Sequence, residues 1–173
     1  MPLAPCKKWQ RPLRERIEVT RYNRACPRHT GTCSPIYFRN LHVVPRRIYG
    51  VELLLGAELN IIDYKGTIDL GEEYFPMLDI RIAGIHSLCY KPGTVEQNTE
   101  AMIGAIRNPH VHIISHPGDG TAEVDFEPIV LASKEHHTLL EINNSSLNRS
   151  ARNSPPGIIT SRSCAYARNT RFL

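Results

Sequence analysis

The 173-residue chain has no apolar run close to the ~20 residues that a membrane-spanning helix needs. Its basic N-terminus is not followed by an apolar stretch, so we expect no secretory signal peptide. Its five cysteines form neither a Cys-x-x-Cys pair nor a zinc-finger spacing. These absences favour a cytoplasmic protein with reduced thiols and no membrane partner. The length and the hydrophobic content of 41% suit one domain of ordinary size.

Acidic residues are scarce at both ends of the chain. Residues 1–33 and 148–173 hold 13 of the 21 Lys and Arg but only two of the 17 acidic residues, so together they carry +11. Residues 34–147 hold the remainder and carry −7. This split is typical of a domain with nucleic-acid-binding tails, but it also fits flanks that are not natural protein sequence. Composition does not decide between the two.

The two ends also lack the periodicity of regular structure. Neither shows a sustained period of 2 or 3.6, and their composition is typical of disorder. Their aromatic residues form no pattern that would suit stacking on bases, so we do not expect nucleic acid as a partner. These aromatic residues are Trp9, Tyr22, Tyr166 and Phe172.

The middle of the chain repeats one pattern, an apolar strand-like run that ends in a polar residue able to do chemistry. The four runs end at Glu58, His86, His116 and Asn143, at intervals of 28, 30 and 27 residues. Each interval is close to the ~30 residues of one βα unit. Because the runs are nearly continuous in Val, Ile and Leu, they predict strands of a parallel sheet.

Two helices are predicted between the later strands. Thr94 followed by Gln97 is a capping box for the segment that follows. Asp125 can cap a second helix, whose Pro128 is tolerated because it lies in the first turn. The middle is therefore expected to fold as β-α-β-α-β preceded by a further strand. In such folds, polar residues at the carboxyl ends of strands form the active site.

Glu58, His86 and His116 are the candidate metal ligands. One carboxylate and two imidazoles suit zinc and leave a position open for water. A single histidine at a strand end is more often a hydrogen-bonded loop residue, but three such residues in register favour a shared metal site. Two further histidine pairs are not expected to bind metal. His110 and His112 begin the strand that ends at His116, which puts His112 roughly 13 Å from it, and His136 and His137 end a helix.

The middle region contains the motifs YGVELLLGAE, LDIRIAGIHS, VHIISHPGD and LEINNSS. In their order and spacing, these motifs resemble the PHP (polymerase and histidinol phosphatase) family. The most similar branch is the small bacterial phosphatases with a trinuclear zinc site. This resemblance implies a distorted (βα)7 barrel that hydrolyses phosphomonoesters of small molecules with metal-activated water. The metal would be zinc, with manganese as the alternative.

The resemblance also implies roles for individual residues. Glu58 would be the bridging carboxylate, and His86 and His116 would be its partners on one metal. The three residues that follow the last strand would form the wall of the active site without binding metal. These wall residues are Asn143, Asn144 and Ser145.

Three motifs of the family are missing from this chain. The family opens with a His-x-His strand, continues with Thr-Asp-His and closes with Asp-x-His, whereas Ala25 occupies the register of the second motif's histidine. We therefore expect an α/β fold that is an incomplete barrel of about four parallel strands, with open edges and an uncovered apolar face. The phosphoesterase is expected to be inactive in this chain. The alternative is a non-catalytic fragment, or a binding module whose basic tails contact nucleic acid.

The expected organisation is a partial PHP domain at 34–147 between two segments foreign to the family, 1–33 and 148–173. These flanks are expected to be disordered or translated out of frame. If the codons for Ile17 to His29 are read in the frame one nucleotide further on, the genetic code allows a peptide very similar to the family's missing strand. The codons for Ser163 to Thr170 permit a peptide similar to its next helix. Stop codons in those frames at the genomic locus would contradict the frameshift.

Overall fold

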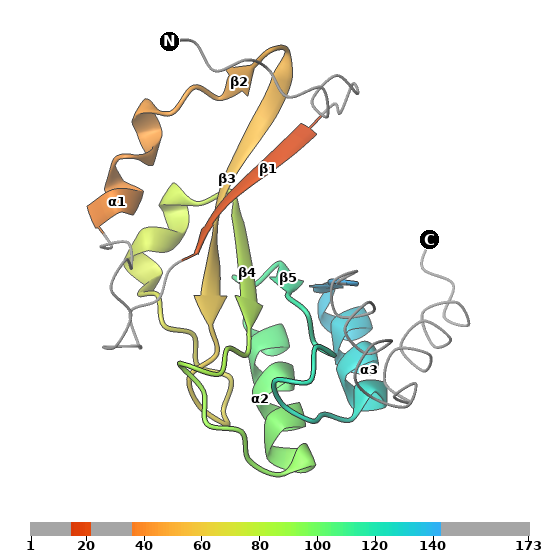
Figure 1. The fold of residues 1–173 in the computed structure, drawn as a ribbon. Coiled ribbons are helices and arrows are strands. Elements are labelled where there is room, and N and C mark those ends of the chain that lie inside the picture. The colour runs from red at the N-terminus through yellow and green to blue at the C-terminus, as the bar shows by residue number, and fades with distance from the viewer. Residues whose placement is uncertain (1–14, 22–35, 143–173) are drawn as a thin grey trace.

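The computed structural model describes residues 15–21 and 36–142, and these form an α/β fold around one sheet (Figure 1). The sheet order is β1-β3-β4-β5-β6, and β2 pairs with β3 outside this path. The strands are β1 (Glu15–Arg21), β2 (Arg47–Ile48), β3 (Val51–Asn60), β4 (Ile80–Gly84), β5 (Ile113–Ile114) and β6 (Leu139–Leu140).

Every pairing along the main path is parallel, and only β2 runs antiparallel to its neighbour. Glu58 of β3 lies level with Ile82 of β4, Ile82 with Ile113 of β5, and Ile113 with Leu139 of β6. The carboxyl ends of these strands therefore lie along one edge of the sheet. The predicted α/β class with a mainly parallel sheet is confirmed.

Within the described residues the sheet is open. β1 and β6 stand at the two ends of the strand order and do not pair with each other. The structure therefore contains an α/β sheet but no closed barrel in this part of the chain. β1 is itself a difference from expectation, because it lies within the segment that composition marked as disordered. Its backbone pairs with β3 along seven residues, a long-range partner that composition does not encode.

Two α-helices follow β4 and β5 as predicted. α2 (Val95–Arg107) begins at Thr94, whose hydroxyl accepts from the Gln97 N–H while the Gln97 side chain accepts from the Thr94 N–H. α3 (Phe126–His136) begins at Asp125, whose carboxylate accepts from the Glu127 N–H. Both helices therefore start where side-chain oxygens satisfy free backbone N–H groups.

Between residues 36 and 79, the helical segments that the structure describes are short turns. They pack with β3 in one apolar cluster, in which Leu53, Leu55, Ala57 and Leu59 alternate along the strand. The connection from β3 to β4 therefore carries a 3-10 helix where a βα unit would have an α-helix. The turns are α1 (Ile36–Arg39), η2 (Leu41–Val43) and η3 (Glu72–Met77).

A second apolar cluster joins α2 and α3 to β4 and β5, through Ala83, Ile85 and Ile114. Ala83 is level with Leu59 of β3, so both clusters lie on the same face of the sheet. On the opposite face, Ile80, Ile82 and Ile113 are only partly buried, and Leu139 is 64% exposed. This matches the expectation of an uncovered apolar face for the part of the chain that the structure describes.

None of the helices in the described ranges is both long and apolar enough to cross a membrane.

Candidate metal centre

Glu58 lies near the carboxyl end of β3, on the face of the sheet opposite the helices. The apolar residues on either side of it, Ala57 and Leu59, are fully buried against the helical turns. Because successive side chains of a strand point to opposite faces, the carboxylate of Glu58 is directed away from that core. Its side chain stays 17% exposed, so it is shielded from most solvent and remains reachable by a small ligand.

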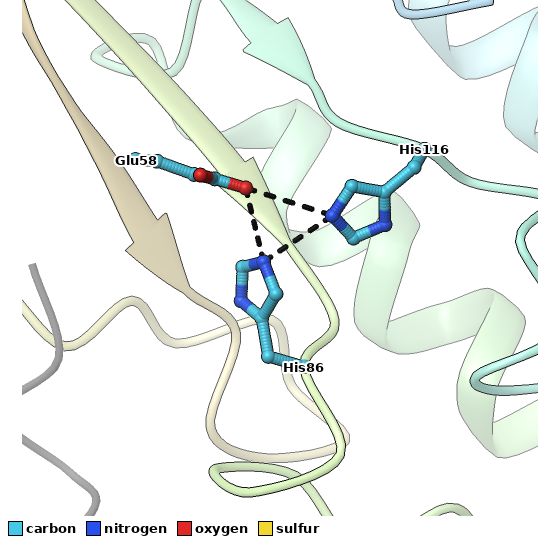
Figure 2. Close-up of side chains that lie close together, drawn as sticks. All are labelled: Glu58, His86 and His116. Atoms are coloured by element: carbon cyan, nitrogen blue, oxygen red, sulfur yellow. Dashed lines mark hydrogen bonds and ion pairs between the residues drawn. The ribbon is translucent and has the colours of Figure 1, made fainter. Parts of the chain in front are cut away.

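His86 and His116 follow the ends of β4 and β5, each two residues beyond the strand. Figure 2 shows their rings turned toward the Glu58 carboxylate. Glu58 Oε1 lies 3.0 Å from His86 Nε2 and 3.5 Å from His116 Nε2, and the two Nε2 atoms are 3.2 Å apart. The three predicted ligands therefore converge on one point, from three neighbouring strands.

These distances fit a tetrahedral metal ion. Zinc binds nitrogen and carboxylate oxygen at about 2.0–2.2 Å, so two ligand atoms of a tetrahedral site lie about 3.3–3.5 Å apart. The three separations, 3.0, 3.2 and 3.5 Å, are at or slightly below that value. Glu58, His86 and His116 are the one group within the described ranges that could hold a metal ion.

The pKa of His116 shows how strongly this site attracts positive charge. Burial lowers that pKa, but hydrogen bonds to Asp119 and Glu58 and the attraction of both carboxylates outweigh burial and raise it to about 9. Two imidazole nitrogens 3.2 Å apart beside a carboxylate also favour a shared cation. The centre is therefore built to hold positive charge.

Gly84 makes room for the Ser115 hydroxyl beside the two imidazoles at the end of β4. A Cβ atom added there would lie 2.1 Å from Ser115 Oγ, and 3.4 and 3.5 Å from the Cε1 atoms of His86 and His116. A side chain at this position would displace the buried Ser115 hydroxyl, whereas its distances to the two rings are ordinary van der Waals contacts. The packing of Ser115 beside the two histidines therefore favours a glycine here.

Two carboxylates beside His116 were not among the predicted site residues. Asp119 Oδ2 lies 3.1 Å from His116 Nδ1, and Glu141 Oε2 accepts from the His116 N–H at 2.8 Å. Burial raises the pKa of Asp119, but the His116 side chain and two hydrogen bonds from Thr121 lower it to about 2. The spacing of Asp119, three residues after His116, was the signal that could have identified it.

His110, His112, His136 and His137 do not belong to the group of candidate ligands found within the described residues. His112 contacts Arg81 through both ring nitrogens, and His110 packs on Phe75. His136 and His137 are exposed at the end of α3. The predicted wall residues, Asn143, Asn144 and Ser145, lie outside the described residues.

The chain is similar to bacterial proteins named probable phosphatases. One from Caldicellulosiruptor bescii is 50% identical over 120 residues, which cover 69% of this chain and 50% of that protein. One from Caldicellulosiruptor saccharolyticus is 48% identical over 69% of this chain and 50% of that protein. One from Acetivibrio thermocellus is 46% identical over 64% of this chain and 46% of that protein. The chain thus spans about half the length of the curated relatives it matches. No protein-family model matches it.

Proposed function

We propose that this chain carries part of the active site of a PHP-type, metal-dependent phosphomonoesterase. The observation that carries the proposal is the convergence of Glu58 Oε1 and the Nε2 atoms of His86 and His116 within 3.5 Å. The similarity to probable phosphatases supports the reaction class. The open parallel sheet would be one part of a distorted barrel, and the substrate a phosphorylated small molecule.

Glu58, His86 and His116 would together hold one zinc ion, or manganese in its place. Zinc bound there would polarise a phosphate oxygen and lower the pKa of a coordinated water. The carboxylate of Glu58 would balance part of the ion's charge, while the two imidazoles would act as neutral ligands. The side chains of these residues are 12–17% exposed, which limits competing water and strengthens the electrostatic interactions at the site.

We further propose that this chain alone hydrolyses phosphomonoesters at a negligible rate. Clamping a phosphate between two ions stabilises both the attacking and the leaving oxygen. The described residues gather one group of metal ligands, which accounts for a single ion. We therefore expect this protein to bind a metal ion without hydrolysing substrate.

The metal site is tested by the zinc content of the purified full chain, measured by elemental analysis after dialysis. We expect about one zinc per chain in the wild type and almost none in His86→Ala or His116→Ala. The matched control is His136→Ala, which removes an exposed histidine outside the site and should keep its zinc. Circular dichroism would verify that each variant is folded. Stoichiometric zinc in both site variants would refute the assignment.

Turnover is tested with a generic aryl phosphate, supplied with zinc or manganese. We expect rates at the background of the buffer for the wild type and for Glu58→Gln alike. A metal-dependent rate that disappears in Glu58→Gln would support the phosphatase while showing that the proposed inactivity is wrong.

A further inference from the structure

We propose that Asp119 and Glu141 are positioning residues that hold His116 so that its Nε2 faces Glu58 and His86. The inference rests on the proposed metal function, because it assigns the groups that prepare one of the ligands. Asp119 would fix the imidazole ring and Glu141 the backbone. Neither carboxylate is within the group of atoms that would bind the metal directly.

The backbone of His116 adopts a conformation that needs support. Its φ of 34° lies in the left-handed region, which is unfavourable for a non-glycine residue. Such conformations persist where the surrounding structure holds them in place, and they are concentrated at functional sites. The His116 N–H donates to Glu141 Oε2 at 2.8 Å, from the residue directly after β6. The next strand of the sheet therefore holds the turn that carries the ligand.

The ring of His116 is fixed by Asp119 in the same turn. The Asp119 N–H donates to the His116 carbonyl at 3.1 Å, and Asp119 Oδ1 accepts from the Thr121 N–H at 2.8 Å. The other carboxylate oxygen, Oδ2, faces His116 Nδ1 at 3.1 Å. Because an ionised carboxylate only accepts hydrogen bonds, Nδ1 must carry the proton. Nε2 is then the nitrogen left for a metal.

His86 provides the comparison within the same site. Its Nδ1 is buried and has no hydrogen-bond partner among the described residues, whereas Nδ1 of His116 has the Asp119 carboxylate. Groups that hydrogen-bond the far nitrogen of a ligating histidine fix its tautomer and orientation and raise its basicity. His116 is therefore the ligand whose geometry is set before a metal arrives.

The role of Asp119 is tested on the full-length protein with zinc as the probe. Affinity would be measured by competition with a chromophoric chelator in the wild type, Asp119→Ala, Asp119→Asn and Thr121→Val. We expect Asp119→Ala to bind zinc about 10–100-fold more weakly. The zinc affinity of Asp119→Asn should lie between those of the wild type and Asp119→Ala, because asparagine keeps a hydrogen-bond acceptor and loses the charge. Thr121→Val is the matched control, since it removes a hydroxyl bonded to Asp119 and leaves the contact with His116.

The role of Glu141 is tested in the same assay with Glu141→Gln and Glu141→Ala. The amide oxygen of glutamine can still accept from the His116 N–H, so Glu141→Gln should bind zinc nearly as tightly as the wild type. Glu141→Ala should bind zinc about tenfold more weakly. Equal affinity in Glu141→Ala and the wild type would overturn the part assigned to Glu141.

A second measurement reads the positioning of His116 without any metal. In metal-free protein with 15N-labelled histidine, the hydrogen-bonded Nδ1–H of His116 should give a ring N–H signal that is absent from Asp119→Ala and present in Thr121→Val. Persistence of that signal in Asp119→Ala, or unchanged zinc affinity there, would overturn the inference and leave the metal site standing. If the wild type binds no zinc, the proposed function fails, and the ring signal alone decides the role of Asp119.

Discussion

Two histidine clusters lie near the opposite ends of β4, and they differ in electrostatic character. At the carboxyl end, Glu58, His86 and His116 form the metal cluster. There, burial lowers the pKa of His116, but the neighbouring Asp119 carboxylate and that of Glu58 outweigh burial and raise this pKa to about 9. At the amino end, Arg81, His110, His112 and Phe75 form the arginine cluster. There, burial first and then the charges of Arg81 and His110 lower the pKa of His112.

The comparison teaches that histidines flanking neighbouring strands acquire different chemistry from their charged neighbours. Beside carboxylates, an imidazole is ready to share a cation. Beside a guanidinium, it is held neutral and serves packing and hydrogen bonding. The predictions below test this contrast, from the largest expected effect to the smallest.

Arg81→Met should destabilise the protein by about 2–4 kcal/mol and leave zinc affinity unchanged within a few-fold. The guanidinium donates to the carbonyls of Phe75, Leu78 and His110, and charged hydrogen bonds of this kind are worth at most about 1.5–3 kcal/mol each. The expected loss is smaller than their sum because Arg81 is only partly buried, so water can replace part of these bonds. Chemical denaturation measures the loss. The control Arg107→Met removes an exposed ion pair with Glu100 and should cost less than ~1 kcal/mol. Similar losses in both variants would show that the arginine cluster is not structural.

Zinc affinity should rise with pH, by about tenfold per unit between pH 7 and 8. Because the pKa of His116 is about 9, the metal-free protein holds a proton there that zinc must displace. Calorimetry in buffers of different ionisation enthalpy should therefore detect about one proton released per zinc at pH 7. Zinc binding without proton release would contradict the assignment of His116.

The two clusters should give the metal-free protein opposite dependences of stability on pH. The pKa of His116 is raised above its unfolded value of 6.5, so its contribution is fully present below pH 6.5 and is lost as pH rises through 9. After allowance for solvent screening this amounts to about 1–2 kcal/mol. The pKa of His112 is lowered, so that residue costs stability as pH falls below 6.5.

This contrast is measured by denaturation of the wild type, His116→Gln and His112→Gln across pH 5.5–9.5 with a chelator present. The stability advantage of the wild type over His116→Gln should shrink toward high pH. Its advantage over His112→Gln should shrink toward low pH. Parallel curves for the wild type and either variant would show that the corresponding histidine is not coupled to its cluster.

The smallest effect is expected for His110→Ala, with a loss of about 1 kcal/mol or less. Its ring lies 4.9 Å from the Phe75 ring and is largely exposed, so the variant loses an aromatic contact and a weak electrostatic influence on His112. Zinc binding should stay at the wild-type level. A loss of zinc in this variant would contradict the separation of the two clusters.

Much of the described fold follows from local features of the sequence. Apolar runs about one βα unit apart predicted β3, β4, β5 and β6, and Thr94 and Asp125 marked the starts of the two helices. The lengths of the strands were less predictable, because β5 and β6 pair over only two residues each. Strand length depends on backbone hydrogen bonds to the neighbouring strand, and the pattern of apolar residues in the sequence does not predict those bonds.

The sequence by itself determined which residues form the candidate metal site, because the carboxyl ends of parallel strands share one edge of a sheet. Once the runs ending at Glu58, His86 and His116 were parallel, their polar ends had to be neighbours. Only the tertiary structure decided that β1 joins β3, that the sheet stays open within the described residues, and that Asp119 and Glu141 hold His116. These features depend on partners brought together by folding, such as Glu141, which follows His116 by 25 residues.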